Sequence, residues 1–348
     1  MTAPSLDMSD ITVHPGSSPV GHPTSFVARA SAAAGSAVWI PGGTFLMGSD
    51  RHYPEETPVH RARVSGFWMD QYSVTNAQFE KFVAATGHIT VAEAAVDPRD
   101  YPGGLPQMLE PHSRVFVKPD ELGAQHDVQN WWVYTRGADW RHPEGPDSSN
   151  RGLEDHPVVH VAYRDAQAYA VWAGKMLPTE AQWEFAARGG LEGAEFPWGN
   201  EIMPGGRYMA NFWQGKFPWQ NLAGDGYERT SPVGAFPPNA YGVFDMVGNT
   251  WEWTSDWYRQ HHAEENQNAG IPLDPRGGRR NESLDPTQPR TRIPRKVVKG
   301  GSYLSGASHC FRFRPAARLP QSIDTPTCHL GFRCITRGID EVERFSRP

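Results

Sequence analysis

The 348-residue sequence contains only three cysteines, Cys310, Cys328 and Cys334. That number is too small for a disulfide framework, so nothing in it requires an oxidising compartment. No apolar run approaches the roughly 18 residues that a membrane-spanning helix needs. The net charge of −6 argues against general binding to nucleic acid or to an anionic membrane, because both partners are negatively charged.

Several motifs of common enzyme classes are also missing. The sequence has no Walker loop, no Gly-x-Ser-x-Gly, no Cys-x-x-Cys and no His-Glu-x-x-His. Its fourteen histidines show no paired helical spacing that would suit zinc. The first 36 residues are rich in Ala, Ser and Pro and lack the apolar segment of a secretory signal. We therefore expect a disordered tail over residues 1–37 and a cytoplasmic protein.

Glycine and proline are abundant, at 35 and 31 residues, and so is tryptophan, at 13. This composition predicts many turns around an aromatic core. Two helices are expected where a threonine is followed three residues later by glutamine, at Thr75 and Thr179, each with a glycine stop, at Gly87 and at Gly189–Gly190. Phe79, Phe82 and Val83 should form the buried face of the first helix.

The remaining elements are expected to be short. We predict a hairpin around Pro41–Gly43, a strand-like segment over 59–72, a buried strand over 158–161, a helix over about 165–173, and strands within 241–253 and 297–314. Residues 140–146 should be irregular. With no internal repeat and no linker, residues 38–336 read as one α+β domain with little regular structure, followed by a tail over 337–348.

Cys310 lies beside an alternating segment, Phe311-Arg-Phe-Arg314. If this segment is a strand, Cys310 shares a face with Arg312 and Arg314, and His309 lies on the face of the phenylalanines. Guanidinium groups favour the thiolate, which binds metal and acts as a nucleophile. The competing interpretation is a small, buried, inert cysteine. The local pattern alone leaves both open.

Seven segments together resemble the formylglycine-generating enzymes, or sulfatase-modifying factors. They begin at Ile40, Trp140, Trp172, Ala210, Gly248, Lys299 and His329, and read IPGGTFLMG, WRHPEGP, WAGKMLPTE, ANFWQG, GNTWEW, KGGSY and HLGFRC. The resemblance covers about residues 38–336. It implies a single C-type-lectin-like domain. It also implies an oxidoreductase that uses dioxygen to convert a cysteine in an unfolded sulfatase segment, Cys-x-Pro-x-Arg, to an aldehyde.

The resemblance also implies a copper site, and this sequence departs from it. In the family two cysteines of the C-terminal loop hold Cu(I); the second corresponds to Cys310, but the first falls on Ser305. Cu(I) favours thiolates over a hydroxyl, so the paired site is altered. By resemblance, Ser302 borders the oxygen site and Trp251 forms a wall, although turn formation and core packing would also explain these two residues.

We assign His309, His329 and Arg314 to the substrate side of the site. His309 stands where the family usually has tyrosine, and His329 where many members have asparagine. A laboratory Cys→Ser change would account for Ser305 but not for these two differences, so natural divergence is favoured.

Two calcium sites are implied by the same resemblance, with oxygen donors that suit a hard cation. The first would use the side chains of Asn211 and Asp225 and the carbonyls of Phe212 and Tyr227. The second would use Asp245 and Glu252 with the carbonyls of Gly248 and Thr250.

The two disulfides of secreted relatives cannot form here. Cys334 would face Ala170, and the other bridge would fall on Ala187 and Pro315. This agrees with a reducing compartment.

The sequence thus favours a monomeric, copper-dependent oxidase of a sulfatase cysteine, altered by Ser305. The alternative is a non-catalytic paralogue that keeps peptide binding. A non-haem iron sulfoxide synthase ranks last, because such enzymes need an additional helical-bundle domain.

Overall fold

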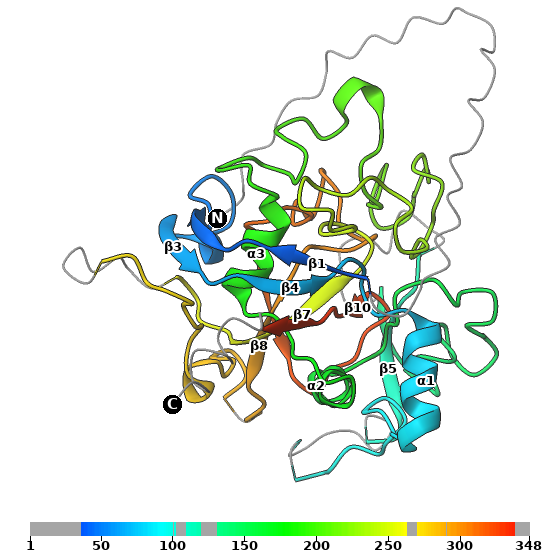
Figure 1. Ribbon diagram of the computed structural model, residues 1–348. Coiled ribbons are helices and arrows are strands. Elements are labelled where there is room, and N and C mark those ends of the chain that lie inside the picture. Colours follow the sequence, from blue (N-terminus) through cyan, green and yellow to red (C-terminus); the bar gives the residue numbers. More distant parts are fainter. Residues whose placement is uncertain are drawn as a thin grey trace, which may run out of the picture. The chain divides into compact units, whose positions relative to one another are not determined.

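The computed structural model describes residues 36–99, 101, 109–119, 131–262, 270–289 and 291–337. The predicted tails, apart from Ser36, Ala37 and Arg337, lie outside the described residues. Figure 1 shows short strands and a few helices joined by long irregular connections. Separate helices and mainly antiparallel strands confirm the α+β class. None of the described helices is long and apolar enough to cross a membrane.

The described strands form two sheets and two separate strand pairs. The antiparallel sheet β1-β4-β11 consists of Ala37–Ile40, Phe67–Asp70 and Ile335–Arg337. The sheet β10-β7-β8-β9 consists of Leu330–Gly331, Trp251–Trp257, Arg295–Lys299 and Arg318–Ser322, and only its β10-β7 pair is parallel. The antiparallel pairs are β2 (Gly43–Met47) with β3 (His60–Val64), and β5 (His112–Phe116) with β6 (Trp132–Arg136).

Both predicted capping boxes are confirmed. In α1 (Asn76–Thr86) and α3 (Glu180–Arg188), the threonine side chain accepts a hydrogen bond from the backbone of the glutamine, whose side chain accepts one from the threonine backbone. Such a cap stabilises a helix by about 1 kcal/mol. The helices end at Gly87 and Gly189, both left-handed. Helix α2 (Tyr163–Trp172) begins two residues before the predicted start. Short 3-10 turns cover Pro54–Glu56 (η1), Pro204–Gly206 (η5) and Arg280–Glu282 (η6).

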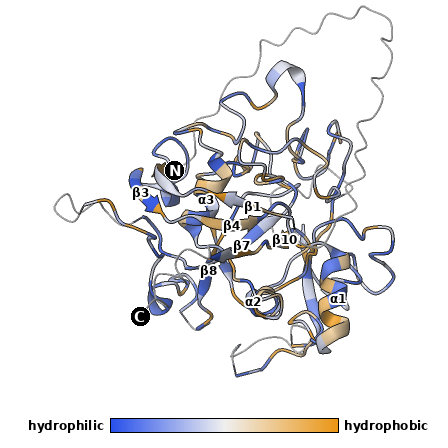
Figure 2. Ribbon diagram, viewed as in Figure 1, coloured by the Kyte–Doolittle hydropathy of each residue, from blue (hydrophilic) through white to orange (hydrophobic). Residues whose placement is uncertain are grey.

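Two large apolar clusters hold these elements together. The predicted face of α1 is buried and packs with Trp251 and Trp253 of β7. Helix α3 packs against the β2-β3 pair, and a second cluster that includes Trp183 joins these elements to the β1-β4-β11 sheet. Figure 2 shows α1 with both hydrophobic and hydrophilic residues, as expected for a helix buried on one side.

Several predicted strands are wrong. The hairpin around Pro41–Gly43 does not form, because β1 pairs with β4 while β2 pairs with β3; Gly42 and Gly43 both have positive φ and redirect the chain between sheets. Residues 158–161 are buried but not a strand, since His160 adopts φ 59°. Within 241–253 and 297–314, regular strand is confined to the residues of β7 and β8.

Candidate functional site

The loop after β8 brings Ser302, Ser305 and Cys310 together. Gly306 and Cys310 exchange two backbone hydrogen bonds of 3.1 and 3.0 Å, which close a narrow loop. The Ser305 hydroxyl consequently lies 3.9 Å from the Cys310 sulfur. It also accepts a hydrogen bond of 3.2 Å from the backbone N–H of Ser302. Ser302 and Ser305 are buried, whereas Cys310 is half-buried.

The segment that follows Cys310 is not the predicted strand. Even so, Nη1 of Arg312 lies 3.9 Å from the Cys310 sulfur, as the predicted shared face required. Arg314 is different: its guanidinium is buried and binds both carboxylate oxygens of Glu56. In this arrangement Glu56 occupies the Arg314 guanidinium, and the assignment of Arg314 to the substrate side stays a prediction. Arg314 anchors the loop from within.

The loop between β2 and β3 holds the Cys310 loop, and sequence reasoning missed it. The Tyr53 hydroxyl accepts a hydrogen bond of 2.9 Å from the backbone N–H of Phe311. The Tyr53 ring lies 3.7 Å from the Arg312 guanidinium carbon. Glu55 accepts hydrogen bonds of 3.2 and 2.6 Å from Arg312. The adjacent acids Glu55 and Glu56, facing two alternate arginines, were the only sequence signal of this contact.

His309 is exposed to solvent on one side and packs its ring against an aromatic side chain on the other. Its ring stacks on Phe217 at 3.8 Å, and Nε2 lies 2.7 Å from the carbonyl oxygen of Leu304. Burial lowers the pKa of His309 to about 4, so the ring is neutral at pH 7 and donates from Nε2. His309 therefore fixes the loop in this structure and carries no charge toward a substrate.

His329 is linked to His309 by a row of aromatic rings. Its ring is 4.8 Å from Trp132, and ring contacts continue from Trp132 through Phe116 and Phe217 to His309. Burial, followed by the charge of Arg114, lowers the pKa of His329 to about 3. The ring is half-buried and neutral, and its Nδ1 lies 3.2 Å from the Thr327 hydroxyl oxygen.

Trp251 belongs to the core. Its side chain is 4 % exposed, and its backbone N–H donates to the His329 carbonyl at 2.8 Å. The core-packing interpretation of Trp251 thus fits the structure, and its link to the site runs through the backbone of β7 and β10.

The other two cysteines are buried and apolar in character. Burial raises the pKa of the Cys328 thiol, and raises that of Cys334 further above its ordinary value. Cys328 accepts a hydrogen bond from the backbone N–H of Phe116 at 3.2 Å. Cys334 packs in the same cluster as Ala170. All three cysteines are free.

The donor set around Cys310 does not fit the paired-thiolate copper site that the resemblance implies. It offers one thiol and one hydroxyl, 3.9 Å apart. A hydroxyl is a poor ligand for a soft cation. Among the residues that the structure describes, no three His, Cys, Asp or Glu side chains are grouped to hold a metal ion.

The first predicted calcium set fits a cation better. The side-chain oxygen of Asn211 is buried and has no hydrogen-bond partner, while its nitrogen donates to Arg229 at 2.8 Å. Asp225 is half-buried, and burial raises its pKa. The Gln214 amide nitrogen contacts both the Phe212 carbonyl and the Asp225 carboxylate. The unpaired Asn211 oxygen is what an oxygen-ligated cation would satisfy, and the Asp225 carboxylate accepts a hydrogen bond of 3.1 Å from the backbone N–H of the next residue, Phe212.

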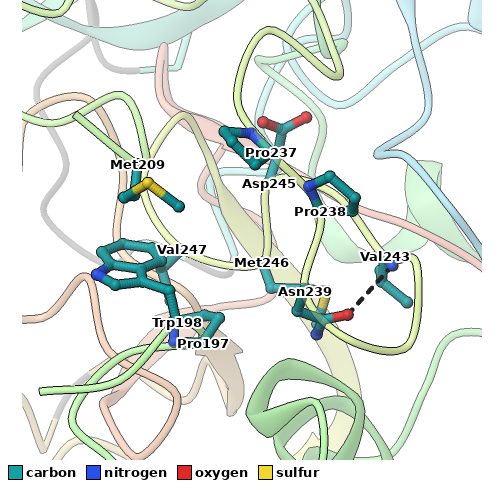
Figure 3. A pocket seen from close by; sticks show the side chains of 10 residues that line it. All are labelled: Pro197, Trp198, Met209, Pro237, Pro238, Asn239, Val243, Asp245, Met246 and Val247. Atoms are coloured by element: carbon teal, nitrogen blue, oxygen red, sulfur yellow. Dashed lines mark hydrogen bonds between the residues drawn. The ribbon is translucent and has the colours of Figure 1, made fainter. Parts of the chain in front are cut away.

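The second set does not fit as arranged. The Glu252 carboxylate already accepts hydrogen bonds from Ser73, from Trp183 and, at both oxygens, from Arg333. Asp245 is buried and lines a pocket whose other walls are mostly proline and apolar side chains (Figure 3). Burial raises the pKa of Asp245 to about 6. A hydrogen bond from the backbone N–H of Gly234 and the charge of Arg333 oppose this rise. Glu252 has no free lone pair to share with a cation.

The sequence matches the family described as "Sulfatase-modifying factor enzyme 1-like domain" over residues 23–338. It is 48% identical over 296 residues to the formylglycine-generating enzyme of Mycobacterium tuberculosis, covering 85% of this chain and 96% of that one. Identity to the mouse (Mus musculus) formylglycine-generating enzyme is 46% over 298 residues, covering 85% of this chain and 73% of that one.

A second mouse relative has a different printed name. The mouse inactive C-alpha-formylglycine-generating enzyme 2 is 38% identical over 307 residues, covering 85% of this chain and 84% of that one. Among solved structures, PvdO from Pseudomonas aeruginosa shares the fold, with a TM-score of 0.58 and 24% identity over 87% of this chain and 94% of that one. The family match and these identities, with Ser302, Ser305 and Cys310 in one loop, show that the chain belongs to the sulfatase-modifying factor, or formylglycine-generating enzyme, family.

Proposed function

We propose that this protein binds a cysteine-containing segment of a sulfatase and oxidises that cysteine to formylglycine with dioxygen. The observation that carries the proposal is the 48% identity to a formylglycine-generating enzyme over 96% of that relative. The half-buried Cys310 beside Arg312 supports it, because this thiol combines access with a neighbouring positive charge.

The reaction replaces sulfur by oxygen at the cysteine Cβ. The Cβ–S bond breaks and a carbonyl forms, so that a thiol, dioxygen and two hydrogen atoms from an external thiol reductant yield an aldehyde, hydrogen sulfide and water. Cys310 can meet the client thiol, while Arg312 holds a positive charge close to both sulfurs. The loop between β2 and β3 keeps Arg312 in place through Glu55.

A non-catalytic, peptide-binding role is the second candidate. Ser305 is the feature that favours it, because the resemblance implies a second cysteine at this position, and two relatives, from mouse and from Bos taurus, are named inactive. The protein would then hold the client cysteine without changing it.

Calcium is part of the proposal for the loops around Asn211. We propose one Ca²⁺ bound by Asn211, Asp225 and the carbonyls of Phe212 and Tyr227, supported by the orphaned Asn211 oxygen. Its contribution would be structural, since these loops contain no regular strand or helix.

The test of function uses a synthetic Cys-x-Pro-x-Arg peptide, a thiol reductant and air. We expect slow aldehyde formation, read by mass spectrometry and by hydrazide capture, that is abolished in Cys310→Ala. A matched control is Cys328→Ala, which removes a buried thiol. Peptide binding without aldehyde, in the natural protein and in Ser305→Cys loaded with Cu(I), would contradict the oxidase and support the binding role.

A further inference from the structure

Arg114 lies on β5, at the end of the aromatic cluster that also contains Trp132. Its backbone is fixed on both sides: the N–H donates to Pro326 at 3.2 Å and the carbonyl accepts from Cys328 at 3.0 Å. The start of the segment that carries His329 therefore runs alongside Arg114. Arg114 also pairs with Tyr134 across the β5-β6 ladder.

Two aromatic rings hold the Arg114 side chain. The guanidinium carbon is 5.4 Å from the Trp132 ring centroid and 5.4 Å from that of Tyr134. Cation–π contacts at this distance orient a guanidinium but leave its N–H donors unused. Because the Trp132 ring also contacts His329, the plane of Arg114 is fixed relative to the candidate site.

Arg114 has no compensating acid among the residues that the structure describes. Its Nε is buried and has no hydrogen-bond partner. Other arginines around the site are paired: Arg312 with Glu55, Arg314 with Glu56, and Arg229 with Glu144. A guanidinium that is oriented, partly desolvated and not paired with an acid can bind a carboxylate from another molecule strongly. The reason is that charge-assisted hydrogen bonds from Arg to a carboxylate are short and directional.

A row of aromatic rings links Arg114 to the Cys310 loop. Ring contacts lead from Trp132 through Phe116 and Phe217 to His309, the residue before Cys310. Tyr303 and Leu304, from the Cys310 loop, belong to the same cluster. A peptide that presents its cysteine to Cys310 and crosses the partly buried rings of Phe217 and Trp132 would pass Arg114.

We propose that Arg114 is a specificity-determining residue that binds an Asp or Glu side chain of the client peptide near the target cysteine. This inference rests on the proposed function, because it assigns the client by its charge. The chemistry required of the client is a carboxylate on the same segment as the cysteine.

The test compares fluorescein-labelled peptides of equal length that share Cys-x-Pro-x-Arg. One peptide has only neutral residues at its other positions. Each member of a second series carries a single Glu at a different position on either side of the cysteine. Fluorescence anisotropy gives Kd for the natural protein, Arg114→Gln and Arg114→Lys. The control is Arg292→Gln, an exposed arginine before β8 that belongs to none of these contacts.

At one position of the Glu, we expect the acidic peptide to bind the natural protein about tenfold more tightly than the neutral peptide. Arg114→Gln should abolish that preference and leave the Kd of the neutral peptide unchanged, Arg114→Lys should keep part of it, and Arg292→Gln should keep all of it. Thermal melting checks that each variant is folded.

Two results would overturn the inference, and they are distinguishable. If the neutral peptide binds but no Glu position improves binding, or if the preference survives in Arg114→Gln, Arg114 has only a packing role and the proposed function stands. If neither peptide binds the natural protein, the client assignment and the proposed function fall together.

Discussion

Cys310 and Arg312 form the central contact of the candidate site, with the sulfur 3.9 Å from Nη1. The opposite edge of the same guanidinium binds Glu55, and its face covers Tyr53. Arg312 is thus fixed while it faces the thiol. Cys310 is partly accessible beside this fixed positive charge, whereas Cys328 and Cys334 are buried in apolar surroundings that disfavour a thiolate.

Cys310 should therefore react first with alkylating agents. Iodoacetamide at neutral pH, followed by peptide mass spectrometry, should label Cys310 about tenfold faster than Cys328 or Cys334, whose buried thiols have raised pKa values. All three should react equally in denaturant. Faster labelling of either buried cysteine in the native protein would contradict this assignment.

Ser305→Cys should create a Cu(I) site. The two side-chain ligand atoms are already 3.9 Å apart, so a small adjustment would place two thiolates around one ion. Competition with a chromogenic Cu(I) chelator should show tighter binding by about 100-fold or more, since a second soft ligand replaces a weak one. Ser302→Cys is the matched control. Equal affinities of Ser305→Cys and the natural protein would show that the loop geometry is unsuitable.

Calcium should raise the melting temperature. A ligand that binds only the folded state stabilises it by about 2.7 kcal/mol at 100 times its Kd. We expect Asp225→Asn to lose the shift between calcium and chelator, and Asp97→Asn, an exposed carboxylate, to keep it. Identical midpoints for the natural protein, with no bound calcium by elemental analysis, would refute the site.

The two ion pairs of the Cys310 loop should differ in energy. Glu56→Gln leaves the Arg314 guanidinium buried without a countercharge and should cost about 3–5 kcal/mol of unfolding free energy. Burial raises the pKa of Glu56, although the hydrogen bonds and the charge of Arg314 oppose this rise. The intact pair therefore adds little net stability, and its main effect is to avoid an unpaired charge in the interior. Glu55→Gln, at the partly exposed Arg312, should cost about 1 kcal/mol. Equal losses in urea denaturation would contradict the burial argument.

Acid should destabilise the protein through Glu184. Burial disfavours its charge, but Lys299 and Arg188, at 2.9 and 2.6 Å, outweigh burial and lower its pKa to about 2 from an ordinary value of 4.5. Because the folded pKa is depressed, this stability is present above pH 4.5 and is lost as pH falls toward 2. About 3 kcal/mol is involved. Glu184→Gln should lower the free energy of unfolding at pH 7 by a similar amount. Its unfolding free energy, measured by urea denaturation, should also depend less on pH between 4.5 and 2.

Local chemistry predicted the helices well. The Thr75–Gln78 and Thr179–Gln182 boxes and the stops at Gly87 and Gly189 depend on neighbours within one or two turns. The strands were predicted less well, because pairing joins residues that are distant in sequence. Ile40 pairs with Phe67 and Met47 with His60, which no local pattern around Pro41 could reveal.

The candidate site likewise has features that could be predicted from the sequence and features that only the fold reveals. The family resemblance, and not the local residue pattern, placed Ser302, Ser305 and Cys310 in one loop, and the structure brings these residues together. Arg312 and Arg314 alternate in sequence, but only folding shows that one faces the thiol and the other binds Glu56. Tyr53 is more than 250 residues from Phe311 and reaches it through tertiary structure.

Strand β4 lies between the first and the last described strands of the chain, β1 and β11. During synthesis, Trp68 and Met69 emerge from the ribosome long before their partners Thr336 and Ile335. The edge of β4 must therefore wait, unpaired, until nearly the whole domain has been translated. Folding of this domain should be largely post-translational and slow, and its nascent chain should depend on chaperones that shield unpaired strand edges.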